Sequence, residues 1–388
     1  MEAAVDAAGA LGCQRHLFDA DDDLSYFDCA AISPLLRASV AAAESAIDLR
    51  AKPWLLSKAS WFESADERRS LVGRLLGCSP GDVALVPSTS YAAALCVRAC
   101  ALTAKLSILA LPDEFPSTFQ TWQSVARSTG ARIIIVEPDA GEGWTEAVLR
   151  ALTPGVGLVS VPTVRWTDGA RLDVARIARA ARDCGALMFV DATQSLGAMP
   201  LDVRSVPAHF IAASGYKWLL GPYGHSYLYV APECQEKAPL EENWIAREGA
   251  DDFARLTRPR PRYRSGARRF DAGQQAGFEL GAMACAALRQ IDSWGVERIS
   301  TALGRITDRI ERSARSAGLA IAAEGRRAPH IVSVAVGHVC DVQEQLVRSK
   351  VRASLRAGLL RLSPHLFIDE HDIRRLEHLF RSIASGAS

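Results

Sequence analysis

The sequence predicts an α/β fold in which helices flank a mostly parallel central sheet, followed by a smaller C-terminal α+β domain. Three observations support this prediction. Short apolar runs alternate with amphipathic helical patterns from residue 83 to residue 230. Beyond about residue 273, two long helical patterns precede strand-like runs that are few and short. The chain has 388 residues, which is longer than a domain with a single hydrophobic core usually is, so we expect two domains.

The elements follow in order along the chain. Strand-like runs lie at residues 83–86, 106–111, 132–136, 157–161, 186–190, 209–213 and 226–230. Helical patterns precede or separate them at residues 35–50, 65–76, 91–102, 118–128 and 174–184. The C-terminal part has helical patterns at 277–293, 296–317, 342–349 and 370–384, with strand-like runs at 330–336 and 359–363. Short β-branched runs between helices are typical of parallel sheets covered on both faces.

Amino-acid composition and the positions of Pro- and Gly-rich stretches divide the chain into three parts. Residues 1–24 read as a weakly structured arm that ends in an acidic run. Residues 25–258 hold the alternating pattern and form the predicted large domain. Residues 259–388 form the predicted small domain, which begins with an Arg-, Pro- and Gly-rich connection. We expect the N-terminal arm to pack on this small domain.

The charge balance and the cysteines narrow the class of protein. A net charge of +1 argues against nucleic acid or an acidic membrane as the main partner. No apolar run approaches the ~20 residues of a membrane span, and the N-terminus lacks the basic region of a signal peptide. Nine scattered cysteines lack metal-ligand spacing and fit a reducing compartment. We therefore expect a cytoplasmic protein without a bound metal.

Polar residues follow the predicted strands directly. They are Ser88, Glu114, Thr163, Asp191 and Ser214. In open parallel sheets, ligands bind at the carboxyl ends of the strands. We therefore expect these five residues to gather around one site.

The stretch SGYKWLLGPYG, residues 214–224, places Lys217 before a glycine-punctuated aromatic turn. An amine held among apolar groups loses its proton easily and becomes a nucleophile toward carbonyl carbons. Asp191 closes the apolar run LMFVD upstream of it. A surface lysine and a turn aspartate are the ordinary alternatives. We expect instead that the two segments hold one cofactor.

These motifs carry a resemblance to a known family. DATQSLG followed by SGYKWLLGPYG resembles the class V aminotransferase group of fold-type I pyridoxal phosphate (PLP) enzymes, and the likeness extends from YFDCAA to LRLSPHL. Members include cysteine desulfurases, kynureninases, C–S lyases and isopenicillin N epimerase-like proteins. The resemblance implies pyridoxal 5'-phosphate as cofactor, a small amino-acid substrate, and a homodimer with active sites at the interface.

The resemblance also implies roles around the cofactor ring. Lys217 is the Schiff-base lysine and proton shuttle, and Asp191 faces the pyridine nitrogen, keeping the ring an electron sink. Gln194 is a candidate donor to the phenolic oxygen. Phe115 stands where the family stacks an aromatic on the ring, and Tyr216 precedes the lysine where desulfurase-like relatives often carry His.

The phosphate is expected at the start of the helix that follows Ser88. Unpaired N–H groups and the helix dipole favour an anion there. Ser88, Thr89 and Ser90 precede this helix, and Ser214 adds a further hydroxyl. Taken alone, the same three residues are typical of a plain N-cap.

A basic segment is a second phosphate candidate. ARRFDAGQ, residues 267–274, resembles the segment that reaches across the family's dimer interface to the neighbour's phosphate. Gln274 stands there where desulfurases have Thr, and Arg264 and Arg268 are other possible anion contacts. A solvated basic loop is the alternative.

The C-terminal motif departs from the desulfurase pattern. Arg361 matches the arginine that clamps the substrate α-carboxylate, and Arg356 matches the arginine of the desulfurase loop. That loop would continue with a His-Cys pair, but this chain has Leu359 and Leu360. Cys340 lies outside the motif and reads as a core residue. A standard cysteine desulfurase mechanism is therefore disfavoured.

A second departure lies in VRWTDG, residues 164–169. Thr163 and Trp166 stand where desulfurases tend to have His and Asn. Thr163 remains a candidate cofactor contact at the strand end. The usual Asn contact is replaced by a residue of different chemistry.

The expected reaction proceeds through a Cα carbanion of an α-amino acid, with C–S or other β-elimination as the leading outcome. Transamination and epimerisation on the same fold are alternatives, and epimerisation would need a second acid/base among Tyr223, His225 and His365. A non-catalytic PLP-fold partner protein is a further alternative. A nucleotide-binding protein is disfavoured because the chain lacks both GxGxxG and GxxxxGK[ST].

Overall fold

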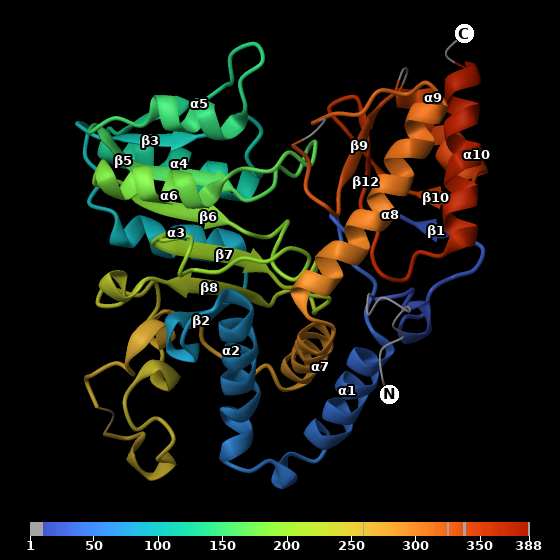
Figure 1. The fold of residues 1–388 in the computed structure, drawn as a ribbon. Coiled ribbons are helices and arrows are strands. Elements are labelled where there is room, and N and C mark those ends of the chain that lie inside the picture. The colour runs from blue at the N-terminus through green and yellow to red at the C-terminus, as the bar shows by residue number, and fades with distance from the viewer. Residues whose placement is uncertain (1–10, 259, 324–325, 337–338, 387–388) are drawn as a thin grey trace.

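A computed structural model describes residues 11–258, 260–323, 326–336 and 339–386. Its largest element is a seven-stranded sheet of order β2-β8-β7-β6-β5-β3-β4 (Figure 1). The strands are β2 (Val83–Val86), β3 (Ser107–Ala110), β4 (Arg132–Ile135), β5 (Val156–Pro162), β6 (Leu187–Asp191), β7 (Phe210–Ser214) and β8 (Ser226–Val230). The five strands from β4 to β7 pair in parallel, and β8 runs antiparallel between β7 and β2. The predicted α/β class with a mostly parallel sheet is confirmed.

Both faces of the sheet are buried, which explains the continuous apolar runs. Along β2, Val83 and Leu85 join one core cluster, and Ala84 and Val86 join the other. Helices α3 (Thr89–Ala99) and α4 (Pro116–Thr129) cover the second cluster, and α5 (Trp144–Ala151) and α6 (Val174–Asp183) cover the first. Successive strand residues point to opposite faces, so each strand serves both cores.

The C-terminal part has its own sheet of order β11-β12-β9, formed by β9 (Val332–Ala335), β11 (Ser354–Arg356) and β12 (Leu359–Leu362). Helices α8 (Val296–Ser316), α9 (Val339–Arg348) and α10 (Glu370–Gly386) stand beside it (Figure 1). Near the N-terminus, α1 (Arg37–Arg50) and α2 (Glu63–Leu76) both contact α7 (Phe278–Trp294). The expected C-terminal strands and helices are present, with ends shifted by a few residues.

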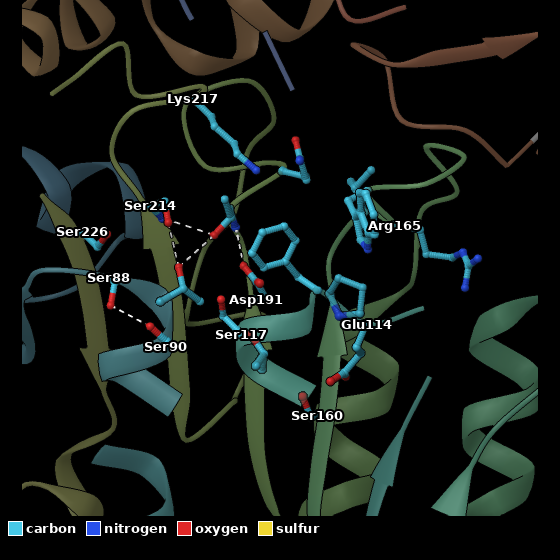
Figure 2. A pocket seen from close by; sticks show the side chains of 18 of the residues that line it. Ser88, Ser90, Glu114, Ser117, Ser160, Arg165, Asp191, Ser214, Lys217 and Ser226 are labelled. Carbon is cyan, nitrogen blue, oxygen red and sulfur yellow. Dashed lines mark hydrogen bonds between the residues drawn. The ribbon is translucent and has the colours of Figure 1, made fainter. Parts of the chain in front are cut away.

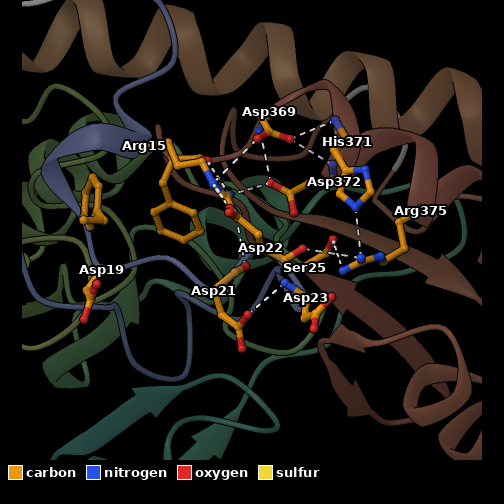
Figure 3. Close-up of polar contacts among 12 residues, drawn as sticks. Arg15, Asp19, Asp21, Asp22, Asp23, Ser25, Asp369, His371, Asp372 and Arg375 are labelled. Atoms are coloured by element: carbon orange, nitrogen blue, oxygen red, sulfur yellow. Dashed lines mark hydrogen bonds and ion pairs between the residues drawn. The ribbon is translucent and has the colours of Figure 1, made fainter.

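The described part of the N-terminal arm lies against the C-terminal part of the chain. Arg15 pairs with Asp372 at 3.1 Å and also contacts Asp22 and Asp369 (Figure 3). Strand β1 (Ser25–Tyr26) then pairs in parallel with β10 (Val351–Arg352). These contacts join the two ends of the chain. The domain limits at residues 24 and 258 stay a prediction.

Some elements were not predicted from the sequence. Helix α5 has only eight residues, and β10 and β11 have two and three. In segments this short, apolar residues recur too few times for a helical or strand periodicity to be recognised in the sequence. The connection after β8 contains several 3₁₀ turns, including Gly266–Phe270. Among the described residues, no helix has the length and apolar character needed to cross a membrane.

Candidate active site

A cavity of about 160 Å³ lies at the carboxyl ends of the parallel strands. Of the five strand-end residues, four line it: Ser88, Glu114, Asp191 and Ser214. In Figure 2 Lys217 enters from one side, Ser88, Ser90 and Ser214 lie together at another, and Glu114 extends toward Ser160. Parallel strands end at one edge of the sheet, so residues distant in sequence meet there.

Lys217 is held inside the cavity by a tight turn after β7. Its exposed fraction is 6%, and its Nζ lies 5.4 Å from the centre of the Phe115 ring. Burial lowers the pKa of the amine to about 8, although the Asp191 carboxylate opposes this change. A side chain at Gly197 would approach the Trp218 carbonyl oxygen to 2.4 Å, and Gly197 has a φ of +97°. Glycine there allows the close backbone contact that supports the turn.

Asp191 ends β6 and points its carboxylate into the same cavity. Oδ1 accepts a hydrogen bond of 2.9 Å from the Thr193 backbone N–H. Burial raises the pKa of this carboxyl, whereas the bonds to Thr193 and the charge of Lys217 act in the opposite direction. The site thus places a buried amine and a half-buried carboxyl in the same cavity.

Hydroxyl groups gather at the N-terminus of α3. Ser88 caps the helix by accepting from the Tyr91 backbone N–H at 3.1 Å. The Thr89 hydroxyl lies 2.8 Å from the Ser214 hydroxyl and 3.2 Å from that of Thr193. A helix N-terminus surrounded by hydroxyl donors suits an anion. Ser88 is therefore an N-cap and also lines the predicted phosphate cradle.

Aromatic side chains line the mouth of the cavity. Phe115 meets Trp166 edge to face at 5.8 Å, and the Trp166 indole donates to the Asp113 carbonyl at 2.6 Å. Tyr216 pairs with Tyr223 at 4.7 Å. Phe115, Tyr216, Tyr223 and Trp166 all line the cavity. Trp166 thus fills the wall with a ring where relatives tend to place an Asn amide.

Two predicted cofactor contacts are placed differently. Gln194 lines the cavity, but its amide also bonds the Ala30 carbonyl and the Trp218 indole. Thr163 does not line the cavity: its exposed fraction is 1%, and its hydroxyl donates to Ser195 at 2.7 Å. Side chains alternate at a strand end, so the residues on either side of Thr163 face the cavity instead.

The two predicted substrate arginines lie behind the cavity wall. Arg361 has an exposed fraction of 1%; its Nη1 donates to the Trp166 carbonyl at 2.5 Å and its Nη2 to Asp28 at 3.3 Å. The Arg356 guanidinium lies 5.9 Å from the centre of the Trp166 ring. Neither arginine lines the cavity. Trp166 therefore stands between both arginines and the space where a substrate would lie.

Gln274 lies away from the cavity of its own chain. It has a φ of +61° in a segment anchored by the buried Arg69, whose guanidinium bonds Asp271 and Gln275. Arg268 of the same segment pairs with Asp66 at 2.9 Å. The reach of Gln274 into a second subunit stays a prediction.

Of the three proposed second acid/base residues, only Tyr223 lines the cavity. His225 bonds Arg68 at 2.8 Å, and burial lowers its pKa to about 3. His365 is fully buried against Phe18 and Trp218. Both histidines were wrong as candidates because neighbouring core residues hold them away from the site.

The cavity lining, as far as the chain is described, contains no cysteine. Leu359 and Leu360 lie in β12, where Leu360 pairs with Val334 of β9. Cys340 is the second residue of α9, and the prediction that its side chain is core falls outside the described residues. The described residues also contain no cluster of three or more possible metal ligands.

Sequence reasoning placed Glu114 at the site without giving it a role, and it did not name Arg165. Both carboxyl oxygens of Glu114 are buried without a hydrogen bond of ordinary geometry among the described residues. Burial raises its pKa to about 8, although the nearby Ser160 hydroxyl acts in the opposite direction. Arg165 stacks on Trp144 at 3.8 Å and bonds Asp168. The strand-end position of Glu114 was a signal for the site, but nothing in the sequence indicated a role.

The donor set fits PLP. A buried amine suits the aldehyde, a half-buried carboxyl suits a ring nitrogen, and the hydroxyl-lined helix N-terminus suits the phosphate. The aromatic Phe115 stands within 5.4 Å of the lysine nitrogen.

Comparison with known sequences agrees with the fit of the cavity to PLP. A family model described as aminotransferase class-V matches residues 26–367. An uncharacterized aminotransferase, YcbU, of Bacillus subtilis is 29% identical over 315 residues, covering 81% of this chain and 82% of its own. The kynureninase of Deinococcus radiodurans is 29% identical over 294 residues, covering 72% and 68%. The isopenicillin N epimerase of Streptomyces clavuligerus is 32% identical over 214 residues, covering 54% and 51%.

Solved structures share the fold. A mutant of C-DES with glycine covalently linked to its PLP cofactor matches with a TM-score of 0.86 at 19% identity, covering 95% of this chain and 99% of that one. The apo cysteine desulfurase of Thermococcus onnurineus matches over the full length of both chains, with a TM-score of 0.83 at 20% identity. Likeness at this identity establishes the architecture.

Proposed function

The chain belongs to the class-V aminotransferase family, and on that basis we propose that it eliminates a substituent from Cβ of an α-amino acid. The match over residues 26–367 confirms the resemblance predicted from the sequence motifs. The family's cofactor is pyridoxal phosphate, so the chain is a PLP-dependent enzyme. The choice of elimination among the reactions of this family is the proposal.

The observation that carries the proposal is that Lys217 and Asp191 line the same cavity. When bound, the cofactor supplies an aldehyde for amines and a ring that takes up the electrons of the bond broken at Cα. Lys217, with a pKa near 8, holds or releases a proton close to neutral pH. Asp191 supplies the carboxylate that keeps a ring nitrogen protonated.

Other residues of the chain would bind and orient. Ser88, Thr89 and Ser214 would hold the phosphate at the N-terminus of α3. Phe115 would cover one ring face, and Gln194 would donate to the phenolic oxygen. These roles rest on the cavity lining and on the order of the family motifs.

The site chemistry favours elimination over sulfur transfer to a protein thiol. No cysteine lines the described cavity, whereas elimination needs only a base at Cα and a leaving group. For a substrate with substituent X on Cβ, the Cα proton and X depart together as HX. The remaining enamine tautomerises and takes up one water to give pyruvate and ammonia. No external oxidant or reductant is needed.

The test is product analysis of purified holoenzyme with cystine, kynurenine and alanine as separate substrates. Elimination predicts pyruvate and ammonia in equal amounts from cystine. Alanine from kynurenine would replace it with hydrolysis, and loss of optical rotation would replace it with epimerisation. A keto acid formed without ammonia, when a second 2-keto acid is added to accept the amino group, would replace it with transamination. Lys217→Ala should abolish product, and the exposed Lys105→Ala is the matched control.

We further propose that the enzyme is a homodimer. Large apolar side chains stand exposed on and beside α1, among them Ile47, Trp54 and Leu55, with Trp54 exposed by 77%. Large apolar side chains that gather in one exposed segment of the chain are a feature of subunit contacts. A mass by light scattering of twice the 41.8 kDa chain supports the proposal, and a monomer at micromolar concentration contradicts it.

A further inference from the structure

The side chain that follows the reactive lysine is itself tied to a cavity residue. Trp218 has an exposed fraction of 0%, and its indole Nε1 donates to Oε1 of Gln194 at 2.9 Å. Gln194 Nε2 donates in turn to the Ala30 carbonyl, also at 2.9 Å. Gln194 is 5% exposed and lines the cavity. A buried amide with both ends engaged has a defined orientation.

Donor and acceptor chemistry fixes which atom of the Gln194 amide is the oxygen and which is the nitrogen. An indole N–H can only donate, so the group that faces Trp218 must be the amide oxygen. A backbone carbonyl can only accept, so the group that faces Ala30 must be the amide nitrogen. The two constraints agree. The –NH₂ group keeps one hydrogen beyond the one given to Ala30, and this hydrogen remains available on a side chain that lines the cavity.

A third buried residue holds the same unit. His330 Nε2 lies 2.5 Å from the backbone oxygen of Gln194, and its ring meets the Trp218 indole edge to face at 4.4 Å. Because that oxygen can only accept, Nε2 carries a hydrogen. Burial lowers the pKa of His330 to about 4, so the ring is neutral at pH 7 and its Nδ1, which has no hydrogen-bond partner among the described residues, is unprotonated. His330 thus contacts both partners of the indole–amide bond.

We infer that Trp218 is a positioning residue, which orients the Gln194 amide so that an N–H rather than a carbonyl oxygen is available to an anionic oxygen of the bound cofactor. The inference rests on the proposed function, which gives Gln194 its partner. Without the indole N–H, the amide loses one of the two bonds that define its orientation. In a variant without the indole N–H, the amide cannot simply rotate, because its oxygen would then face the Ala30 carbonyl oxygen. We expect the whole Gln194 side chain to shift instead.

The test is a pH titration of the visible absorption of the bound cofactor. An N–H donor stabilises the anionic, deprotonated form, so its loss raises the pH midpoint. Gln194→Leu is expected to raise the midpoint by about half a unit to one unit, the worth of one hydrogen bond. Trp218→Phe, which keeps a ring and removes only the N–H side of the indole, is expected to shift it in the same direction.

The double variant separates positioning from a general loss of packing. If Trp218 acts through Gln194, Trp218→Phe adds no further shift in the Gln194→Leu background. Trp294→Phe is the matched control, because Trp294 is equally buried, packs on the same His365 ring, and has an Nε1 without a partner. Additive shifts, an unchanged midpoint in Trp218→Phe, or an equal shift in Trp294→Phe would each overturn the inference.

A second measurement covers the case in which Trp218→Phe fails to fold. In protein labelled with ¹⁵N-tryptophan, the Trp218 indole resonance is expected to move in Gln194→Leu while that of Trp294 stays. An unmoved Trp218 resonance would overturn the inference. A wild-type protein that gives no visible absorption with PLP would instead contradict the proposed function, so the two failures are distinguishable.

Discussion

The backbone oxygen of Trp166 accepts a hydrogen bond from Nη1 of Arg361 at 2.5 Å. Arg361 also donates to Asp28, whose two carboxylate oxygens both accept from the Ser354 hydroxyl. The arginine predicted to clamp a substrate carboxylate is thus already held by the protein. The Trp166 carbonyl and the Asp28 carboxylate engage Nη1 and Nη2, whereas the buried Nε of Arg361 has no hydrogen-bond partner in the described part of the chain.

Replacement of Arg361 by Leu should destabilise the fold strongly. It leaves the Asp28 carboxylate buried without its cation, which typically costs about 3–5 kcal/mol. The half-buried Arg356→Leu is the control, because no carboxylate of the described residues pairs with its guanidinium, so the change should cost less than about 1 kcal/mol. Urea unfolding measures both. Equal losses for the two variants would show that Asp28 does not depend on Arg361.

Capture of PLP by the apo protein should depend on pH through Lys217. Only the unprotonated amine attacks a carbonyl carbon, and burial lowers its pKa to about 8. The rate constant should therefore rise about tenfold per unit below pH 8 and level off above it. Stopped-flow absorbance follows the reaction. A midpoint near 10.5, the ordinary value for lysine, would show that the amine is solvated.

Glu114 should make the apo protein less stable as pH rises. Its folded pKa of about 8 exceeds the ordinary value of 4.5, so between these values the folded state binds more protons than the unfolded state. Stability attributable to this group is therefore complete below pH 4.5 and is lost as pH rises through 8. Glu114→Gln should remove the dependence and gain at least about 1 kcal/mol relative to wild type at pH 8. Parallel denaturation curves for the two proteins would contradict this.

Phe115 should contribute to cofactor affinity through ring contact. Aromatic pairs are worth about 0.5–1.5 kcal/mol beyond burial, so Phe115→Leu should raise the Kd for PLP about three- to tenfold. Phe119→Leu is the matched control, since Phe119 lies in α4, which Phe115 precedes as its N-cap, and does not line the cavity. Fluorescence titration of the apo proteins gives both constants. Equal effects would assign the change to α4 as a whole.

The sequence predicted the parts of the site that strand ends define. Asp191 and Ser214 close β6 and β7, so their meeting follows from the parallel sheet. Thr163 was placed wrongly toward the cavity side because side-chain alternation at the end of β5 depends on where the strand stops. A shift of one residue exchanges the two faces of a strand.

The remaining contacts are long-range and have no local signal. Arg361 meets Trp166 and Asp28, which are 195 and 333 residues away in the chain. His225 and His365 looked available by type, but Arg68 and an aromatic cluster hold them. Burial of this kind depends on which distant segments pack together, and the sequence alone does not show that. The family motifs identified the cofactor, whereas only the structure showed that Arg361 and Arg356 lie outside the cavity lining.

Lys217 is expected to be the residue that binds PLP covalently. Borohydride reduction of the holoenzyme, followed by proteolysis and mass spectrometry, tests this assignment. We expect a reduced pyridoxyl phosphate adduct on the peptide that contains Lys217, and none in Lys217→Ala. An adduct on a different lysine, or a visible cofactor band that persists in Lys217→Ala, would contradict it.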